Sequence, residues 1–122
     1  MTESIKENTI EMIEEILIYI NRARKNRDII EQYYFEQKFE AAKIELDNLF
    51  EGVVWIEYAG LQLGIPNSIS LKDPLFDGIK EALEKDDWLT LIDFISYQYK
   101  RYLDIIEITY WDKYNEMKGR IG

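Results

Sequence analysis

Apolar residues recur at helical spacing along most of the chain, and no stretch alternates apolar and polar residues with a period of two. The pattern therefore predicts helices and no sheet. The first apolar stripe lies near the start of the chain and consists of Ile5, Thr9, Met12, Ile13, Ile16, Ile20 and Ala23. The second steps by three or four residues throughout and consists of Phe39, Ala42, Leu46, Leu49, Val53, Ile56 and Gly60. This second pattern is an a/d seam, which is typical of helices packed nearly parallel to one another.

Local signals predict where the first three helices begin and end. Ser4 and Glu7 have the capping-box spacing, which favours a first helix that starts at residue 2 or 4. Gly60 and Gly64 suit the end of the second helix, where a left-handed residue often closes the last turn. Residues 64–73 (GIPNSISLKD) are the one clear loop, and Asp73-Pro74 predicts the cap and first residue of a short third helix over 74–84.

A fourth helix is expected from a cap at Asp86 or Asp87 to about Lys118, with Gly119 ending it. Its apolar stripe consists of Trp88, Ile92, Ile95, Tyr99, Tyr102, Ile106 and Thr109.

The end of the first helix is less well defined, because residues 21–28 (NRARKNRD) suit either an exposed helical turn or a connection. Shifting the chain by 49 residues favours the first alternative and a turn near residues 36–38, with the first helix running to Tyr34. The shift pairs Ile30 with Ile79, Tyr34 with Leu83, Phe39 with Trp88, Ala42 with Leu91, Leu46 with Ile95, Phe50 with Tyr99, Val53 with Tyr102 and Ile56 with Ile105. We therefore predict an all-α fold, an antiparallel four-helix bundle in one domain over residues 1–122, with two helical hairpins related by a weak internal repeat.

Charge and composition exclude several functions. The chain has 15 basic and 24 acidic residues, a formal charge of −9, which disfavours nucleic acid and anionic membranes as partners. It has no Cys and no His, so thiol chemistry, thiolate zinc sites and histidine-dependent catalysis are absent, and we expect no cofactor and no metal. The polar start is no signal peptide, and no apolar run approaches the ~20 residues of a membrane span, so we expect a cytoplasmic protein.

Clustered carboxylates are the one candidate for catalysis. The five residues concerned are Glu11, Glu14, Glu15, Glu81 and Glu84. Carboxylates that face one another between helices hold magnesium in some nucleotide pyrophosphatases, because Mg²⁺ prefers oxygen ligands. However, the first stripe places Glu11 and Glu14 on the outer face of their helix, with Glu15 nearest its edge. A solvated acidic face is therefore the favoured interpretation, and magnesium-dependent nucleotide hydrolysis is the alternative.

Basic residues gather in one segment, at Arg22, Arg24, Lys25 and Arg27. The functional interpretation is a dock for a phosphate group or an acidic partner segment. The alternative, which we favour, is that these charges balance the surrounding acidic residues.

Aromatic residues make up 14% of the chain, and two of them fall outside the stripe of the fourth helix. Tyr97 and Trp111 lie among charged residues, while Leu103 and Tyr110 flank the stripe. A helix that is apolar over so much of its circumference is either central in the fold or covered by another chain. Alternatively, the 64–73 loop, which carries three apolar side chains, folds over Trp111. Buried tyrosines also require hydrogen-bond acceptors, and inward-drawn acidic residues can supply them.

The stretch FEAAKIELDNLFEGVVWI, together with KDDWLTLIDFISYQYKRYLDII, resembles small acidic all-helical bacterial proteins, and flagellar export chaperones are similar in size and build. The resemblance covers Phe39 to about Ile106 and implies a helical bundle with a binding role. We therefore predict a non-enzymatic protein-binding module, chaperone-like or an adaptor. Its partner-binding residues are predicted to be Tyr97, Leu103, Tyr110 and Trp111, which would hold a partner helix. A homodimeric structural or regulatory protein that uses the same surface is the alternative.

Overall fold

A computed structural model describes the backbone of residues 2–65 and 69–121 and the side chains of residues 7–65 and 72–119. This part of the chain contains no strand and is helical apart from short turns. The helices are α1 (Thr2–Phe35), α2 (Phe39–Leu63), α3 (Ile69–Glu84), α4 (Trp88–Asp93), the π-helix η1 (Phe94–Tyr99) and α5 (Lys100–Ile121). The prediction of an all-helical protein is confirmed.

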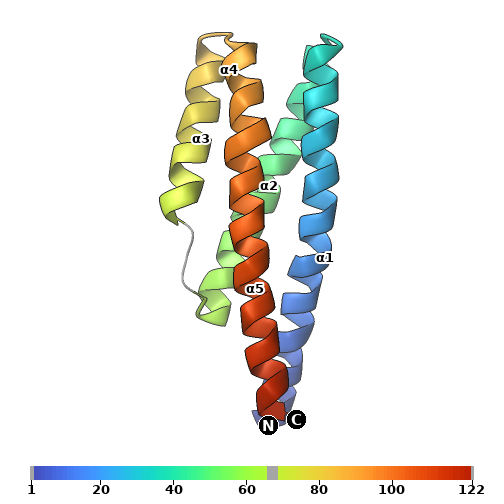
Figure 1. Cartoon of the computed structure of the whole chain (residues 1–122), viewed down its shortest axis with the longest axis vertical. Coiled ribbons are helices and arrows are strands. Elements are labelled where there is room, and N and C mark those ends of the chain that lie inside the picture. Colours follow the sequence, from blue (N-terminus) through green and yellow to red (C-terminus); the bar gives the residue numbers. More distant parts are fainter. Residues whose placement is uncertain (1, 66–68, 122) are drawn as a thin grey trace.

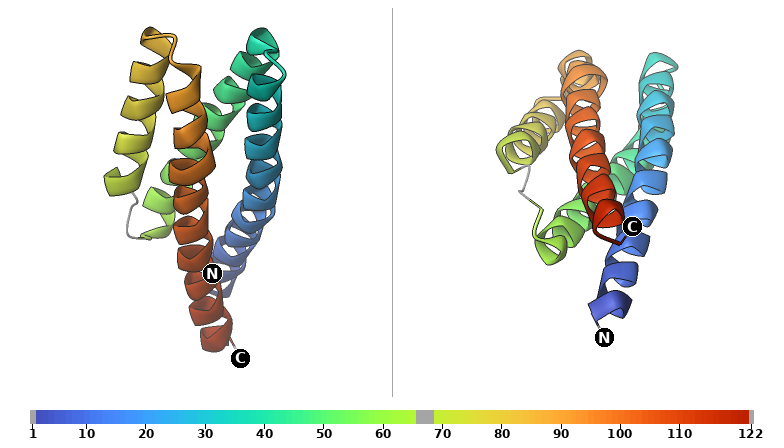
Figure 2. Two further views of the ribbon diagram at one scale, coloured as in Figure 1. Left: turned by 45° about the horizontal axis from the view of Figure 1, so that its top comes forward. Right: turned by 60° about the horizontal axis from the view of Figure 1, so that its bottom comes forward.

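The helices form one elongated group in which α4, η1 and α5 follow one another as a single rod (Figure 1). This rod lies between α3 and α1 in all three views (Figures 1 and 2). Helix α2 runs behind the rod and crosses from the side of α1 toward the start of α3. As a result, α2 and α3 are far apart at the end of the molecule that carries the α1–α2 and α3–α4 turns, which we call the turn end.

The two turns at this end have the same backbone conformation, 49 residues apart. Gln37 and Asp86 both adopt positive φ, at 59° and 51°. The amide of Lys38 donates to the carbonyl of Tyr33 at 2.8 Å, and the amide of Asp87 donates to the carbonyl of Ala82 at 2.9 Å. The predicted turn at residues 36–38 is therefore confirmed, and the first helix does run past Tyr34. The second turn separates the third and fourth helices where their predicted ends leave a gap.

Two predicted helix signals are found in the structure. The Asp87 carboxylate caps α4 by accepting from the Thr90 amide at 3.2 Å and from its hydroxyl at 2.7 Å. These hydrogen bonds hold the pKa of Asp87 below its ordinary value. Gly64 ends α2 in the left-handed region, with φ of 68°, which suits a residue without a Cβ. Gly60 instead lies inside α2, where an added Cβ would stand 3.3 Å from the Tyr110 hydroxyl.

Two predicted helix ends are wrong. Helix α3 begins at Ile69 rather than Pro74, so Pro74 lies inside the helix. Pro74 has no backbone N–H, so α3 lacks one of its regular hydrogen bonds at this position. Helix α5 continues through Gly119 to Ile121, because a lone Gly only weakens a helix. The predicted capping box joins Ser4 and Glu7, and Ser4 is not among the residues whose side chains the structure describes.

The rod contains a π-helix, η1, whose turns are wider than those of an α-helix. The comparison of the two halves pairs Ile56 of α2 with Ile105, which follows η1 in the rod. Ile56 is 1% exposed, whereas Ile105 is 36% exposed and the next residue, Ile106, is 4% exposed. The two paired positions therefore differ in burial.

The core collects the apolar stripes of α1, α2 and the rod into one cluster. Tyrosine hydroxyls within it find acceptors: that of Tyr102 donates to the Glu57 carboxylate at 2.7 Å, and that of Tyr110 donates to the Ile56 carbonyl at 3.1 Å. The prediction that an acidic residue accepts from a core tyrosine is thus confirmed at Glu57.

Buried tyrosines predict a loss of stability at alkaline pH. Burial raises the pKa of both Tyr99 and Tyr110 well above the ordinary 10.0. The stability that these hydroxyls contribute is complete below pH 10.0 and falls as the pH rises above it, because the unfolded chain then releases protons that the folded chain retains. Phenolate absorbance during an alkaline titration should show these two groups ionising only as the helical circular dichroism is lost. Ionisation of all nine tyrosines in a folded chain would contradict this expectation.

Candidate functional site

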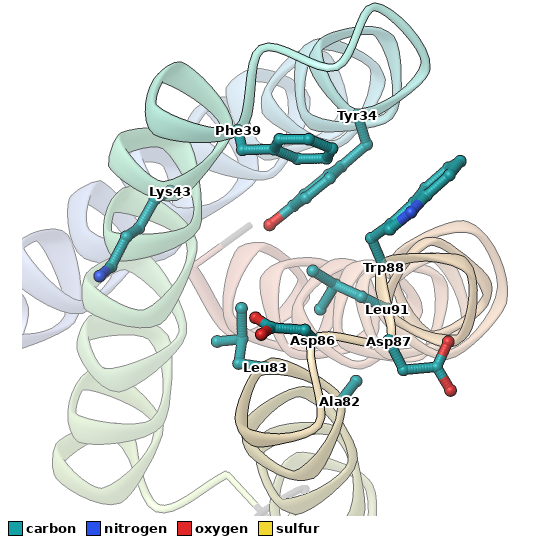
Figure 3. Close-up of a pocket in the computed structure, with 9 residues that line it drawn as sticks. All are labelled: Tyr34, Phe39, Lys43, Ala82, Leu83, Asp86, Asp87, Trp88 and Leu91. Carbon is teal, nitrogen blue, oxygen red and sulfur yellow. The ribbon is translucent and has the colours of Figure 1, made fainter.

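An open pocket lies at the turn end, where α2 and α3 are separated (Figure 3). Its volume is about 450 Å³, within the usual range for ligand sites. We call it the turn-end groove, and its lining residues are Tyr34, Phe39, Lys43, Ala82, Leu83, Asp86, Asp87, Trp88 and Leu91.

Both turns contribute corresponding residues to the turn-end groove. Phe39 and Trp88 are the first residues of α2 and α4, and Tyr34 and Leu83 occupy matching places before the two turns. The positive-φ residues Gln37 and Asp86 reverse the chain tightly enough to bring these side chains to the same end of the molecule.

The walls of the groove are mainly aromatic and aliphatic. The Phe39 ring lies 5.9 Å from that of Tyr34 and 6.3 Å from that of Trp88, measured between centroids. Phe39 is 45% exposed and Leu83 is 37% exposed, although both border this apolar space. The Tyr34 hydroxyl points into the space between α2 and α3 (Figure 3), and burial raises its pKa. The groove thus offers unburied apolar surface with one hydroxyl directed into it.

One ring contact joins α2 and α3 nearer the middle of the molecule. Phe50 and Phe76 meet edge to face, with centroids 4.9 Å apart. Between this contact and the turns, the two helices leave the groove open. Its rim carries one basic residue, Lys43, and two acidic residues, Asp86 and Asp87.

The predicted partner-binding residues do not form one surface. Tyr97 and Trp111 are exposed, at 71% and 46%, but fourteen positions of helix separate them. Leu103 and Tyr110 are buried in the core, so the prediction that they belong to an outer face is wrong. Their burial has a structural cause: the rod lies between α3 and α1 with α2 behind it, so neighbouring helices cover several of its sides.

Trp111 lies at a shallow hollow between α5 and α1. The hollow has a volume of about 330 Å³, and Ile18 and Leu17 of α1 line it with Trp111 and Tyr114. The Trp111 and Tyr114 rings meet edge to face at 5.3 Å. Of the loop predicted to cover Trp111, residues 66–71 lie outside the described side chains. Ile65 lines a different hollow with Thr109 and Asp112.

The basic cluster divides into two kinds of residue. Arg24 bridges from α1 to α5, with N–O distances of 2.8 Å to Asp104 and 3.2 Å to Glu107. Arg27 donates to the carbonyl of Ser96 in η1 at 3.3 Å. Arg22 and Lys25 are exposed. Two of the four basic residues, Arg24 and Arg27, therefore form polar contacts between α1 and the rod. The contacts of Arg24 with acidic residues agree with the interpretation that these charges balance nearby acidic side chains.

The acidic candidates all lie on the surface: Glu11, Glu14, Glu15, Glu81 and Glu84 are exposed. The prediction that Glu11 and Glu14 face outward is confirmed. Glu81 pairs with Lys85 at 2.7 Å. Within the described residues, no group of three or more acidic side chains is placed to hold a metal ion.

Comparison with protein-family models, with curated proteins and with solved structures gave no significant match. The resemblance to flagellar export chaperones therefore stays a prediction. In the described part of the chain, no helix combines the length and the apolar character that a membrane span requires.

The sequence contained a signal for the turn-end groove that pattern analysis assigned to the core. Phe39 and Trp88 are large aromatic residues that directly follow a tight turn in each half of the chain. Stripe periodicity places both on the inward side of their helices. Whether neighbouring helices close over them depends on how far α2 and α3 separate, which periodicity does not encode.

Proposed function

We propose that this protein is a non-enzymatic binding module, built as an antiparallel four-helix bundle of two helical hairpins, whose turn-end groove holds a helix of a partner protein. The observation that carries the proposal is the groove itself, an open space of about 450 Å³ with apolar walls from four helices. Packed helices normally fill the space between them, so aromatic side chains bordering such a space indicate a surface that another chain completes.

A helix is the occupant that best fits this groove. Helices α2 and α3 diverge from the Phe50–Phe76 contact toward the turns, which leaves an open path between them. Recognition of this kind inserts apolar side chains spaced three and four residues apart into a groove. Phe39 and Leu83, on opposite walls, would both lose solvent contact.

Charge specifies the partner further. The protein has a formal charge of −9, and Asp86 and Asp87 outnumber Lys43 at the rim. A helix with basic residues beside its apolar stripe is therefore attracted, whereas an acidic helix is repelled. We assign this binding module a chaperone-like or adaptor role in the cytoplasm.

Replacing Phe39 with Ala should weaken binding of such a helix about tenfold or more, because truncation of a central aromatic side chain removes much of the energy of an interface. The probe is a synthetic amphipathic helix of Leu, Ala and Lys. Calorimetric titration measures its affinity, and a change in tryptophan emission that is lost in Trp88→Phe shows that the peptide enters the groove. Leu83→Arg, on the opposite wall, should weaken binding as well without removing a core residue.

Phe35→Ala is the matched control, because Phe35 lies beside the same turn, is exposed and does not line the groove. It should leave the affinity unchanged. A peptide with Glu in place of Lys should bind more weakly than the Lys peptide. Equal affinities for the parent, Phe39→Ala and Leu83→Arg proteins would rule the groove out as the binding site.

The two alternatives differ in their support. A homodimer is supported by a row of exposed residues on the outer face of α5. Magnesium-dependent nucleotide hydrolysis requires converging carboxylates, and the five candidate residues all face outward in the structure.

A further inference from the structure

The outer face of α5 carries a short, ordered row of four residues: Arg101, Ile105, Ile108 and Asp112. They are spaced four, three and four positions apart, the spacing of a helix seam. At 100° per residue they lie within about 60° of one another around the helix. All four are exposed, Ile105 at 36% and Ile108 at 62%. The row is thus a narrow apolar strip with a basic residue at one end and an acidic residue at the other.

This row is complementary to itself when two copies run antiparallel. Because the spacing is symmetric, Ile105 of one copy then lies opposite Ile108 of the other, and Arg101 lies opposite Asp112. The twofold axis of such a dimer repeats each contact, so the Ile105–Ile108 pair and the Arg101–Asp112 pair each occur twice. We propose that a second copy of this chain packs on α5 in this antiparallel register.

Charge pairing within the chain supports this assignment. Two acidic residues on the side of α5 that faces α1 have partners: Lys100 contacts Asp104 at 3.0 Å, and Arg24 of α1 contacts Asp104 and Glu107. In the described part of the molecule, Arg101 and Asp112 form no ion pair. The two charges that complete the self-complementary row are therefore available to a second copy.

Trp111 extends the apolar strip toward α1. It follows Ile108 by three positions and borders the hollow that Ile18 of α1 also lines. An indole exposed among charged residues becomes partly covered when a second α5 lies along the row. The face is only one helix wide, so the interface belongs to the small, weak class, below about 1,200 Å². The dimer is therefore expected to form in a concentration-dependent way.

Sedimentation velocity of the full chain over a concentration series tests the proposal. The parent protein should change from monomer to dimer as concentration rises, with Trp emission shifting to shorter wavelength, and the shift should be lost in Trp111→Phe. Ile108→Asp should weaken the dimer by about a hundredfold or more, because it places two unpaired carboxylates in the centre of the seam. Ile44→Asp is the matched control, since Ile44 is equally exposed on α2 and should leave the dimer intact.

Exchanging the two charges tests the register directly. Arg101→Asp and Asp112→Arg should each weaken the dimer about tenfold or more, because each places like charges opposite one another. The double variant should restore dimerisation, since an acidic residue 101 then faces a basic residue 112. A strictly monomeric parent, an Ile108→Asp dimer as stable as the parent, or a double variant no better than the single ones would overturn the proposal.

Discussion

Replacing Leu103 with Ala is expected to lower the free energy of unfolding by about 2–5 kcal/mol. Leu103 is fully buried in the core cluster between α5 and its neighbours. Truncation removes apolar surface from the core and leaves a cavity that the surrounding side chains fill only in part. Urea or guanidinium unfolding, followed by circular dichroism, measures the change from the shift in the transition midpoint.

Leu89→Ala makes the same chemical change at an exposed position of α4 and serves as the control. Its effect should stay within about 0.5 kcal/mol, as is usual for surface substitutions. Similar losses in the two variants would mean that Leu103 does not lie in the core, and the original assignment of this residue to an outer face would then regain support.

The second large effect is expected for Arg27→Met, at about 1–3 kcal/mol. The carbonyl of Ser96 in η1 accepts a hydrogen bond from the Arg27 guanidinium at 3.3 Å, which links α1 to the π-helix. Met keeps most of the length and the apolar stem of the side chain but offers no donor. The Ser96 carbonyl would then be left without this partner beside a packed helix.

Two measurements separate this effect from a general loss of charge. Chemical unfolding gives the free-energy change, and amide hydrogen exchange should show faster opening within residues 94–99 than elsewhere in the rod. Arg22→Met, at an exposed member of the same basic segment, should change neither quantity. Unaltered exchange in η1 after Arg27→Met would show that the contact does not stabilise the π-helix.

The parts of the fold that local chemistry determines were predictable from the sequence. The a/d seam of α2, the Asp87 cap and the left-handed Gly64 depend on neighbouring residues, and the structure contains all three. The turn at residues 36–38 was inferred only by comparing the two halves of the chain. That comparison succeeded because both turns use the same backbone conformation.

The parts that depend on packing between distant segments were not predictable in the same way. Leu103 and Tyr110 flank the apolar stripe when every residue advances by 100°, and the stripe does not show that helices cover the rod on several sides. The turn-end groove depends on the crossing direction of α2, which no stripe specifies. Trp111 is 46% exposed and shares its side of the helix with its charged neighbours Asp104 and Glu107. The sequence left open whether the 64–73 loop covers it.

The π-helix also shows how this chain tolerates a change in length. A single-residue insertion in a helix normally rotates everything beyond it by about 100°, which would turn buried side chains outward. Here the wider turns of η1 can take up an extra residue, and the buried residues before and after it, Ile92 and Ile106, both belong to the core. Deleting a residue such as Tyr97 should therefore yield a regular helix with the same inward face. Length variation among natural versions of this protein is accordingly expected at residues 94–99 as well as in its turns.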